Sequence, residues 1–92
     1  VKIDRSFIAG VDTNPEDAAI AAAIIAMAHS LHLRVVAEGV ETRGQLDVMR
    51  ALQCDEIQGY YFSRPVTADA FEAMLRNGTL LPPSEAGMHY HI

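Results

Sequence analysis

The sequence has few of the residues that mark disulfide-rich or nucleotide-loop proteins. It contains one cysteine, Cys54, which excludes an intrachain disulfide and is typical of a reducing compartment. Tryptophan is missing, and neither G-x-G-x-x-G nor G-x-x-x-x-G-K-S/T occurs. The two common phosphate-binding loops of nucleotide-binding proteins are therefore excluded. We expect Cys54 to be a small buried apolar side chain.

Long hydrophobic runs and positive charge are also scarce. The longest apolar run, residues 18–28, has eleven residues, whereas a membrane-spanning helix needs about 20. No secretory signal is visible, so we expect a cytoplasmic protein, with any membrane anchor in an upstream region. The formal net charge of −5 argues against a nucleic-acid polymer or an anionic membrane as the main partner. A small phosphorylated ligand with a divalent cation stays compatible with this charge.

Half of the 92 residues are hydrophobic, and short apolar runs alternate with helical patterns along the chain. We predict strands at residues 1–4, 34–38 and 56–59, and helices at residues 15–32, 43–53 and 68–76. Residues 5–8 continue the first strand or leave it as a loop. Strands that alternate with helices at this spacing predict an α/β fold with parallel strands and right-handed crossovers. The chain opens inside an apparent strand, so we expect a segment of a larger domain.

The helix boundaries and buried faces follow from capping residues and apolar spacing. Asn14, Thr42 and Thr67 stand where helix N-caps are expected, and Gln45 completes a capping box with Thr42. The predicted buried stripes are Ile20, Ile24, Met27, Ala28 and Leu31 in the first helix, Leu46, Met49 and Leu52 in the second, and Phe71, Met74 and Leu75 in the third. We predict one domain segment at residues 1–78 and a poorly ordered tail at residues 79–92.

Each predicted strand carries polar groups near its carboxyl end, the end at which parallel α/β proteins bind ligands. These groups are Lys2 and Asp4, Glu38 and Glu41, and Gln58. A carboxylate binds a divalent cation, a lysine orients water and an amide fixes a substrate oxygen. By spacing alone the set is nonspecific, and a single strand-end glutamate such as Glu38 is more often a solvated acid.

Three longer strings make the pattern specific. Residues 2–8 (KIDRSFI), 36–42 (VAEGVET) and 58–65 (QGYYFSRP) resemble, in order and spacing, the last three motifs of the EAL domain. That family comprises bacterial cyclic-di-GMP phosphodiesterases, and the resemblance covers residues 1–76. It implies the last three βα units of a modified (β/α)8 barrel of roughly 250 residues. It also implies hydrolysis of cyclic-di-GMP to pGpG with two Mg²⁺ or Mn²⁺ ions.

The resemblance implies roles for particular side chains. Lys2 positions the attacking water, Glu38 acts beside the metal pair as ligand or base, and Gln58 lies beside the water and the phosphate. Glu41 supports a loop that couples metal binding to formation of a homodimer, and Asp4 is structural. Arg64 either contacts phosphate or lies in solvent.

Much of the family's site has no counterpart in this sequence. The glutamate of the Glu-Ala-Leu motif, the downstream Asn and Glu ligands and the paired aspartates would all precede Val1. We therefore expect the 92-residue chain alone to be inactive and to self-associate, because Ile3, Val36 and Ile57 or their neighbours would lose their partners in a closed barrel. The alternative is a degenerate module that binds cyclic-di-GMP or a partner protein without turnover. A sensor or diguanylate cyclase domain upstream is a further expected partner.

Other polar and aromatic side chains are weaker candidates. His29 and His32, three residues apart on the first helix, are predicted to be surface or partly packed residues rather than metal ligands. The aromatic residues 60–62 either stack on a guanine or belong to the core.

Overall fold

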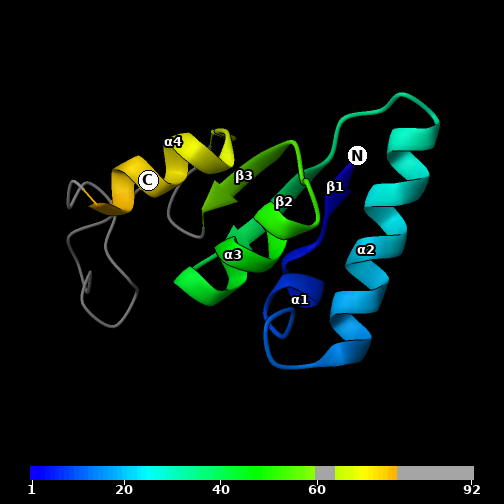
Figure 1. Cartoon of the computed structure of the whole chain (residues 1–92), viewed down its shortest axis with the longest axis horizontal. Coiled ribbons are helices and arrows are strands. Elements are labelled where there is room, and N and C mark those ends of the chain that lie inside the picture. Colours follow the sequence, from blue (N-terminus) through cyan, green and yellow to red (C-terminus); the bar gives the residue numbers. More distant parts are fainter. Residues whose placement is uncertain (60–63, 77–92) are drawn as a thin grey trace.

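The computed structural model describes residues 1–59 and 64–76 (Figure 1). In chain order the elements are β1 (Lys2–Ile3), α1 (Arg5–Ile8), α2 (Pro15–Ser30), β2 (Val36–Val40), α3 (Arg43–Ala51), β3 (Glu56–Gly59) and α4 (Ala68–Arg76). The strands are parallel and lie in the order β1-β2-β3. The predicted α/β fold with parallel strands and flanking helices is confirmed. The predicted tail and the aromatic residues 60–62 lie outside the described residues.

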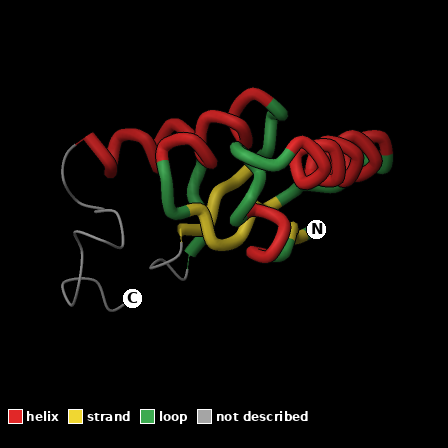
Figure 2. Tube along the Cα trace, turned by 90° about the horizontal axis from the view of Figure 1, so that it is seen from below, coloured by secondary structure: helices red, strands yellow, loops and turns green. Residues whose placement is uncertain are grey.

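The two faces of the sheet differ. The longer helices lie on one side of the strands (Figure 2). Ile3, Ala37 and Ile57 face that side and are at most 1% exposed. Because side chains alternate along a strand, Lys2, Glu38 and Gln58 lie on the opposite face. The prediction named Ile3, Val36 and Ile57 or their immediate neighbours as barrel-facing. Ile3 and Ile57 belong to the buried core cluster of this chain, so the prediction applies to Val36 and to the neighbours of these two residues, Lys2 and Gln58.

Residues 5–8, directly after β1, form the short helix α1. This corrects the prediction that they continue the strand or form a loop. Asp4 has extended backbone geometry and serves as the N-cap of α1. Its Oδ2 atom accepts hydrogen bonds from the Ser6 backbone N–H at 3.0 Å and from Ser6 Oγ at 2.6 Å. An aspartate that satisfies free N–H groups in this way starts a helix and ends the preceding strand. These bonds lower the pKa of Asp4, the side-chain bond from Ser6 most of all.

The buried face of α2 differs in part from the prediction, which was right for Ala28 and for the partly buried Ile24. Ala21, Ile25 and Ala28 face the core, whereas Met27 and Leu31 are 63% and 62% exposed. The helix is apolar almost all the way round, so periodicity alone does not select a face. Two alanines and Ile25 therefore provide the side of α2 that joins the buried core cluster. The exposed side carries an apolar pocket of about 140 Å³ lined by Val1, Ile24, Met27, Ala28, Leu31 and Leu33.

Two helices end in the same way. α2 and α3 are each followed, two residues after their last helical residue, by a non-glycine residue with positive φ, His32 at 60° and Gln53 at 64°. The next N–H then bonds to a carbonyl of the last helical turn, Leu33 N to Ala28 O at 2.8 Å and Cys54 N to Met49 O at 3.0 Å. This is the Schellman geometry, which glycine normally supplies. Both helices therefore stop two residues before the predicted ends.

The outer edge of β3 is partly covered. Val66 forms an antiparallel bridge with Ile57, in which each residue's N–H bonds to the other's carbonyl. Among the residues that the structure describes, β1 therefore has one edge without a partner strand, while the outer edge of β3 is partly paired. Within the described residues, no helix has the length and hydrophobicity needed to cross a membrane.

Candidate functional site

The face of the sheet opposite the helices brings together three of the predicted site residues. Glu38 and Gln58 are paired in the register of β2 with β3. The Lys2 ammonium lies 3.7 Å from Glu38 Oε2, with side-chain exposures of 60% for Lys2 and 25% for Glu38. An ammonium and a carboxylate are therefore adjacent and partly exposed, and the Gln58 amide is paired with Glu38 across the strands, with its Oε1 atom buried. Such a set can orient a water molecule and a polar substrate oxygen.

Glu38 does not end its strand, as the sequence predicted, because β2 continues to Val40. The pairing skips Gly39, which forms a bulge between Glu38 and Val40. Gly39 has φ of +76°, and a Cβ at this position would lie 2.6 Å from Arg5 Cβ. Only glycine suits both constraints. The bulge thus fixes the backbone directly after the candidate acid.

A capping box holds the segment that follows. Thr42 Oγ1 accepts from the Gln45 N–H at 3.1 Å, and Gln45 Oε1 accepts from the N–H groups of Glu41 at 2.7 Å and Thr42 at 3.2 Å. Gln45 is 6% exposed, and its Nε2 donates to Ala9 O at 3.2 Å. The capping box was predicted. The link from α3 to the end of α1 was not, since sequence spacing carries no signal for it.

Arg64 has no hydrogen bond or ion pair with Lys2, Glu38 or Gln58 among the described residues. It is exposed, and among the described residues no carboxylate lies within ion-pair distance of it. The aromatic residues before it lie outside the described part of the chain.

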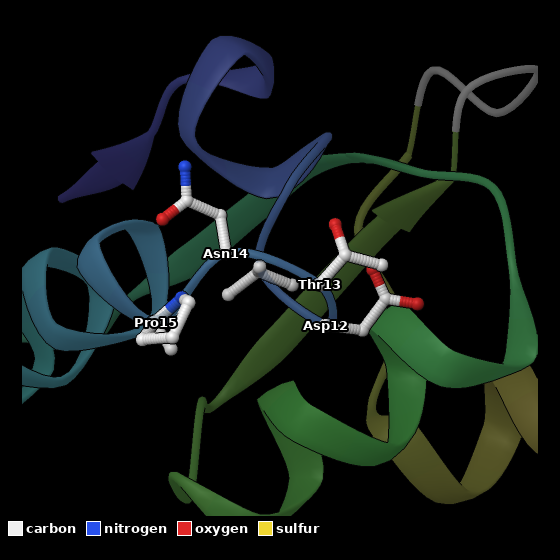
Figure 3. A pocket seen from close by; sticks show the side chains of 6 residues that line it. Asp12, Thr13, Asn14 and Pro15 are labelled. Atoms are coloured by element: carbon white, nitrogen blue, oxygen red, sulfur yellow. The ribbon is translucent and has the colours of Figure 1, made fainter.

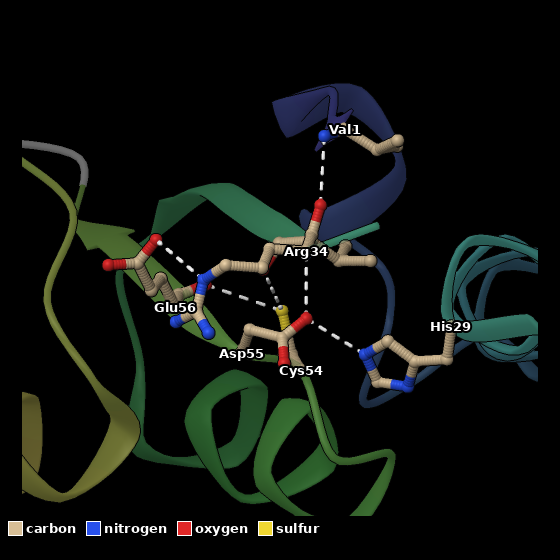
Figure 4. A network of polar contacts seen from close by, with 7 residues as sticks. Val1, His29, Arg34, Cys54, Asp55 and Glu56 are labelled. Atoms are coloured by element: carbon tan, nitrogen blue, oxygen red, sulfur yellow. Dashed lines mark hydrogen bonds and ion pairs between the residues drawn. The ribbon is translucent and has the colours of Figure 1, made fainter. Parts of the chain in front are cut away.

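A polar network at the opposite end of β2 involves two residues that sequence reasoning left without a role (Figure 4). Asp55 Oδ2 accepts from the Val35 N–H at 2.7 Å and lies 2.8 Å from His29 Nε2. Burial pushes the pKa of Asp55 upward, but the hydrogen bonds from His29 and Val35 outweigh it and hold this pKa below its ordinary value. The only sequence signal was an aspartate directly before a predicted strand.

Cys54 lies in the same network and confirms its prediction as a small buried side chain. It is 7% exposed, and its Sγ atom donates to Val35 O and Glu56 O at 3.5 and 3.3 Å. Burial raises the pKa of the Cys54 thiol to about 11. A thiol so rarely ionised at neutral pH is a poor nucleophile, which agrees with a structural role.

A second pocket of about 190 Å³ lies at the start of α2, between Val11 and Ala18 (Figure 3). Asp12, Thr13, Asn14 and Pro15 line it. Asn14 Oδ1 already accepts from the Glu16 N–H at 2.9 Å as the helix cap. None of the predicted site residues lines this pocket, and we assign it no ligand.

The donor set on the polar face fits part of a metal site. Divalent cations such as Mg²⁺ prefer six oxygen ligands, which carboxylates, amides and water supply. Glu38 offers such oxygens, whereas Gln58 Oε1 is buried, and no group of three or more His, Cys, Asp or Glu side chains gathers in the described part of the chain. These residues can therefore contribute to a cation site and cannot form one alone.

The described residues form a segment of a parallel α/β fold with flanking helices, and comparisons with known proteins name the family. The model of the EAL domain family matches residues 1–65. The cyclic di-GMP phosphodiesterase NbdA of Pseudomonas aeruginosa is 54% identical over 76 residues, which are 83% of this chain and 10% of that protein. The chain belongs to the EAL domain family. It spans about a tenth of the length of the curated relatives that it matches first.

Solved structures agree. The EAL domain of Mycobacterium smegmatis DcpA superposes with a TM-score of 0.62 at 39% identity, covering 84% of this chain and 34% of that one. The PaMucR phosphodiesterase in complex with c-di-GMP superposes with a TM-score of 0.62 at 43% identity, covering 76% of this chain and 28% of that one. The chain therefore has the fold of a segment of the EAL barrel, as predicted.

Proposed function

We propose that this chain is the C-terminal part of a phosphodiesterase that hydrolyses cyclic-di-GMP to pGpG, and that it contributes Lys2, Glu38 and Gln58 to the site. The observation that supports this most directly is the Lys2–Glu38 pair at 3.7 Å, on the same face of the sheet as Gln58, which is paired with Glu38. The relatives named as c-di-GMP phosphodiesterases, and the c-di-GMP complex of PaMucR, support the substrate.

In the proposed reaction, a water oxygen attacks phosphorus and one P–O ester bond breaks, so that the ring opens to the linear dinucleotide. Lys2 orients the water and Glu38 holds its proton or a cation, while the Gln58 amide binds a phosphate oxygen. Mg²⁺ or Mn²⁺ ions, when bound, supply positive charge that favours ionisation of the water. Glu38 is the side chain here that would hold such an ion, with the remaining ligands outside this chain.

The remaining parts of the proposal concern the setting of the reaction. We place it in the cytoplasm, in a homodimer whose formation is coupled to metal binding through the loop that Glu41 supports. Arg64 is a candidate phosphate contact. A sensor or cyclase domain upstream would regulate the activity.

The experiment compares Glu38→Gln with Glu56→Gln in the complete EAL domain, measuring pGpG formation at saturating Mn²⁺. Glu56 is a matched control, because it lies on the same face of the sheet and its ion pair among the described residues is with Arg34 at 3.9 Å. We expect Glu38→Gln to lower turnover by at least roughly 100-fold and Glu56→Gln to leave it nearly unchanged. Unaltered turnover in Glu38→Gln would refute the assignment. A domain that binds cyclic-di-GMP but forms no pGpG would favour the receptor alternative.

A further inference from the structure

At the start of the β2–β3 pairing, a side chain accepts a hydrogen bond that a backbone carbonyl would normally accept. Val35 precedes the first paired residue of β2, and its carbonyl accepts from the Glu56 N–H at 3.0 Å. In a regular parallel ladder the Val35 N–H would bond to the carbonyl of residue 54. Here it bonds to the carboxylate of Asp55 at 2.7 Å instead. The carboxylate replaces the backbone group as the first rung of the ladder.

This rung is buried and held from a third element. Val35 is fully buried, so its N–H would have no water to bond with if the carboxylate were displaced. His29, in the last turn of α2, contacts the same Oδ2 atom at 2.8 Å and restrains the carboxylate from the helix side. The position of Asp55 is therefore set by both α2 and β2.

The rung lies three residues before the pair that forms the proposed site. Asp55 precedes Gln58 by three residues on one strand, and Val35 precedes Glu38 by three on the other. A shift of β3 by one residue would remove the carboxylate from the Val35 N–H and turn Gln58 to the helix side of the sheet. The same register of β3 on β2 therefore allows both the hydrogen bond from Val35 to Asp55 and the placement of Gln58 beside Glu38.

We propose that Asp55 is a positioning residue, which places Gln58 beside Glu38 by acting as the first hydrogen-bond acceptor of the β2–β3 ladder. The expected effect on kcat rests on the proposed function. The expected effect on the pairing of β2 with β3 rests on the hydrogen-bond geometry alone. The placement of Gln58 depends on the position of the acceptor oxygen of Asp55 and does not depend on the charge of its carboxylate.

Two substitutions separate position from charge. Asp55→Asn keeps an acceptor oxygen in place without the charge, and Asp55→Glu keeps the charge but moves the oxygens by one methylene. Both are made in the complete EAL domain, with Arg34→Ala as the control at the same end of the sheet. The readouts are kcat and KM for cyclic-di-GMP, thermal melting, and hydrogen exchange of the peptide that contains Val35.

We expect Asp55→Asn and Arg34→Ala to keep kcat within about threefold and to leave the exchange rate unchanged. Asp55→Glu should lower kcat roughly 10-fold or more, with KM nearly constant, because a small misplacement of a site residue is costly. Its Val35 peptide should exchange faster. If Asp55→Glu does not fold, Asp55→Ser replaces it. The serine hydroxyl is too short to reach the Val35 N–H, so we expect the same loss of kcat and the same faster exchange.

Other outcomes overturn the proposal. A loss of kcat in Asp55→Asn, alone or together with Asp55→Glu, would show that charge or bulk stability matters instead of acceptor position. Unchanged exchange in Asp55→Glu would show that the carboxylate does not set the register. Should the unsubstituted domain form no pGpG, the proposed function fails, and the exchange measurements still decide the role of Asp55.

Discussion

Lys2 and Glu38 come from neighbouring parallel strands, and their charged groups lie 3.7 Å apart on the face of the sheet that the helices leave uncovered. Arg34 and Glu56 form a comparable pair at the other end of the strands, at 3.9 Å. Exposed ion pairs of this kind contribute about 0–1 kcal/mol to stability. We therefore expect substitutions in the two ion pairs to have similarly small effects on stability and different effects on the activity of the complete domain.

We expect Lys2→Ala to lower kcat of the complete domain by at least about tenfold, because the ammonium to which we assign the orientation of the water is lost. Binding of cyclic-di-GMP should weaken less than turnover falls. The measurement is single-turnover hydrolysis together with the Kd of the nucleotide under non-hydrolysing conditions. Arg34→Ala is the control and should leave both values unchanged. An equal loss of kcat in the two variants would contradict the role of Lys2.

The positive φ angles of His32 and Gln53 offer a stabilising change. We expect His32→Gly and Gln53→Gly each to raise the free energy of unfolding by on the order of 1 kcal/mol, because glycine enters the left-handed region without a Cβ penalty. The control is Ala51→Gly, which introduces glycine within α3 and should destabilise by about 0.5–1 kcal/mol. Urea unfolding of the complete domain measures all three. Destabilisation by both Schellman-position glycines would show that the side chains of His32 and Gln53 contribute more than their backbone strain.

The lowered pKa of Asp55 predicts an acid-dependent loss of stability. The ordinary pKa is 3.8, and the folded value lies below it. As pH falls through this window, the unfolded state takes up the proton first, so the free energy of unfolding decreases. Above pH 5 this contribution is fully present. We expect Asp55→Asn to flatten the pH dependence of urea unfolding between pH 5 and the acid limit. An unchanged pH dependence in Asp55→Asn would contradict this expectation.

The 92-residue chain alone should self-associate and form no pGpG. Met27 and Leu31 are about two-thirds exposed beside the uncovered edge of β1, and each fully buried side chain of this type contributes about 1.5–3 kcal/mol. Size-exclusion chromatography with light scattering should show species larger than a monomer. Met27→Glu combined with Leu31→Glu should reduce association without loss of helix content. A monodisperse monomer that unfolds cooperatively would contradict this expectation.

The sequence predicts most of this architecture because local chemistry determines it. Asn14, Thr42 and Thr67 cap their helices through their own side chains, as the spacing indicated. The same kind of cap at Asp4 was overlooked, since the preceding residues also suit a strand. The buried face of α2 was mispredicted because an alanine-rich helix presents apolar groups on every side.

Site geometry is predicted less fully, since it depends on strand register. Lys2, Glu38 and Gln58 were identified by residue type, and the pairing of β1, β2 and β3 brings them to one face. Asp55 was missed, because its bond to Val35 joins residues 20 apart in sequence. No periodic pattern reports such a contact before the strands are aligned.

The bridge between Val66 and Ile57 has a consequence for how copies of the isolated chain can combine. Both main-chain groups of Ile57 on the outer side of β3 are already bonded to Val66, so the sheet in the described residues offers an open edge chiefly at β1. Two copies that pair through β1 in a two-fold arrangement use up that edge in each partner. Such an assembly closes at two chains, whereas a sheet open on both sides would extend into a fibre.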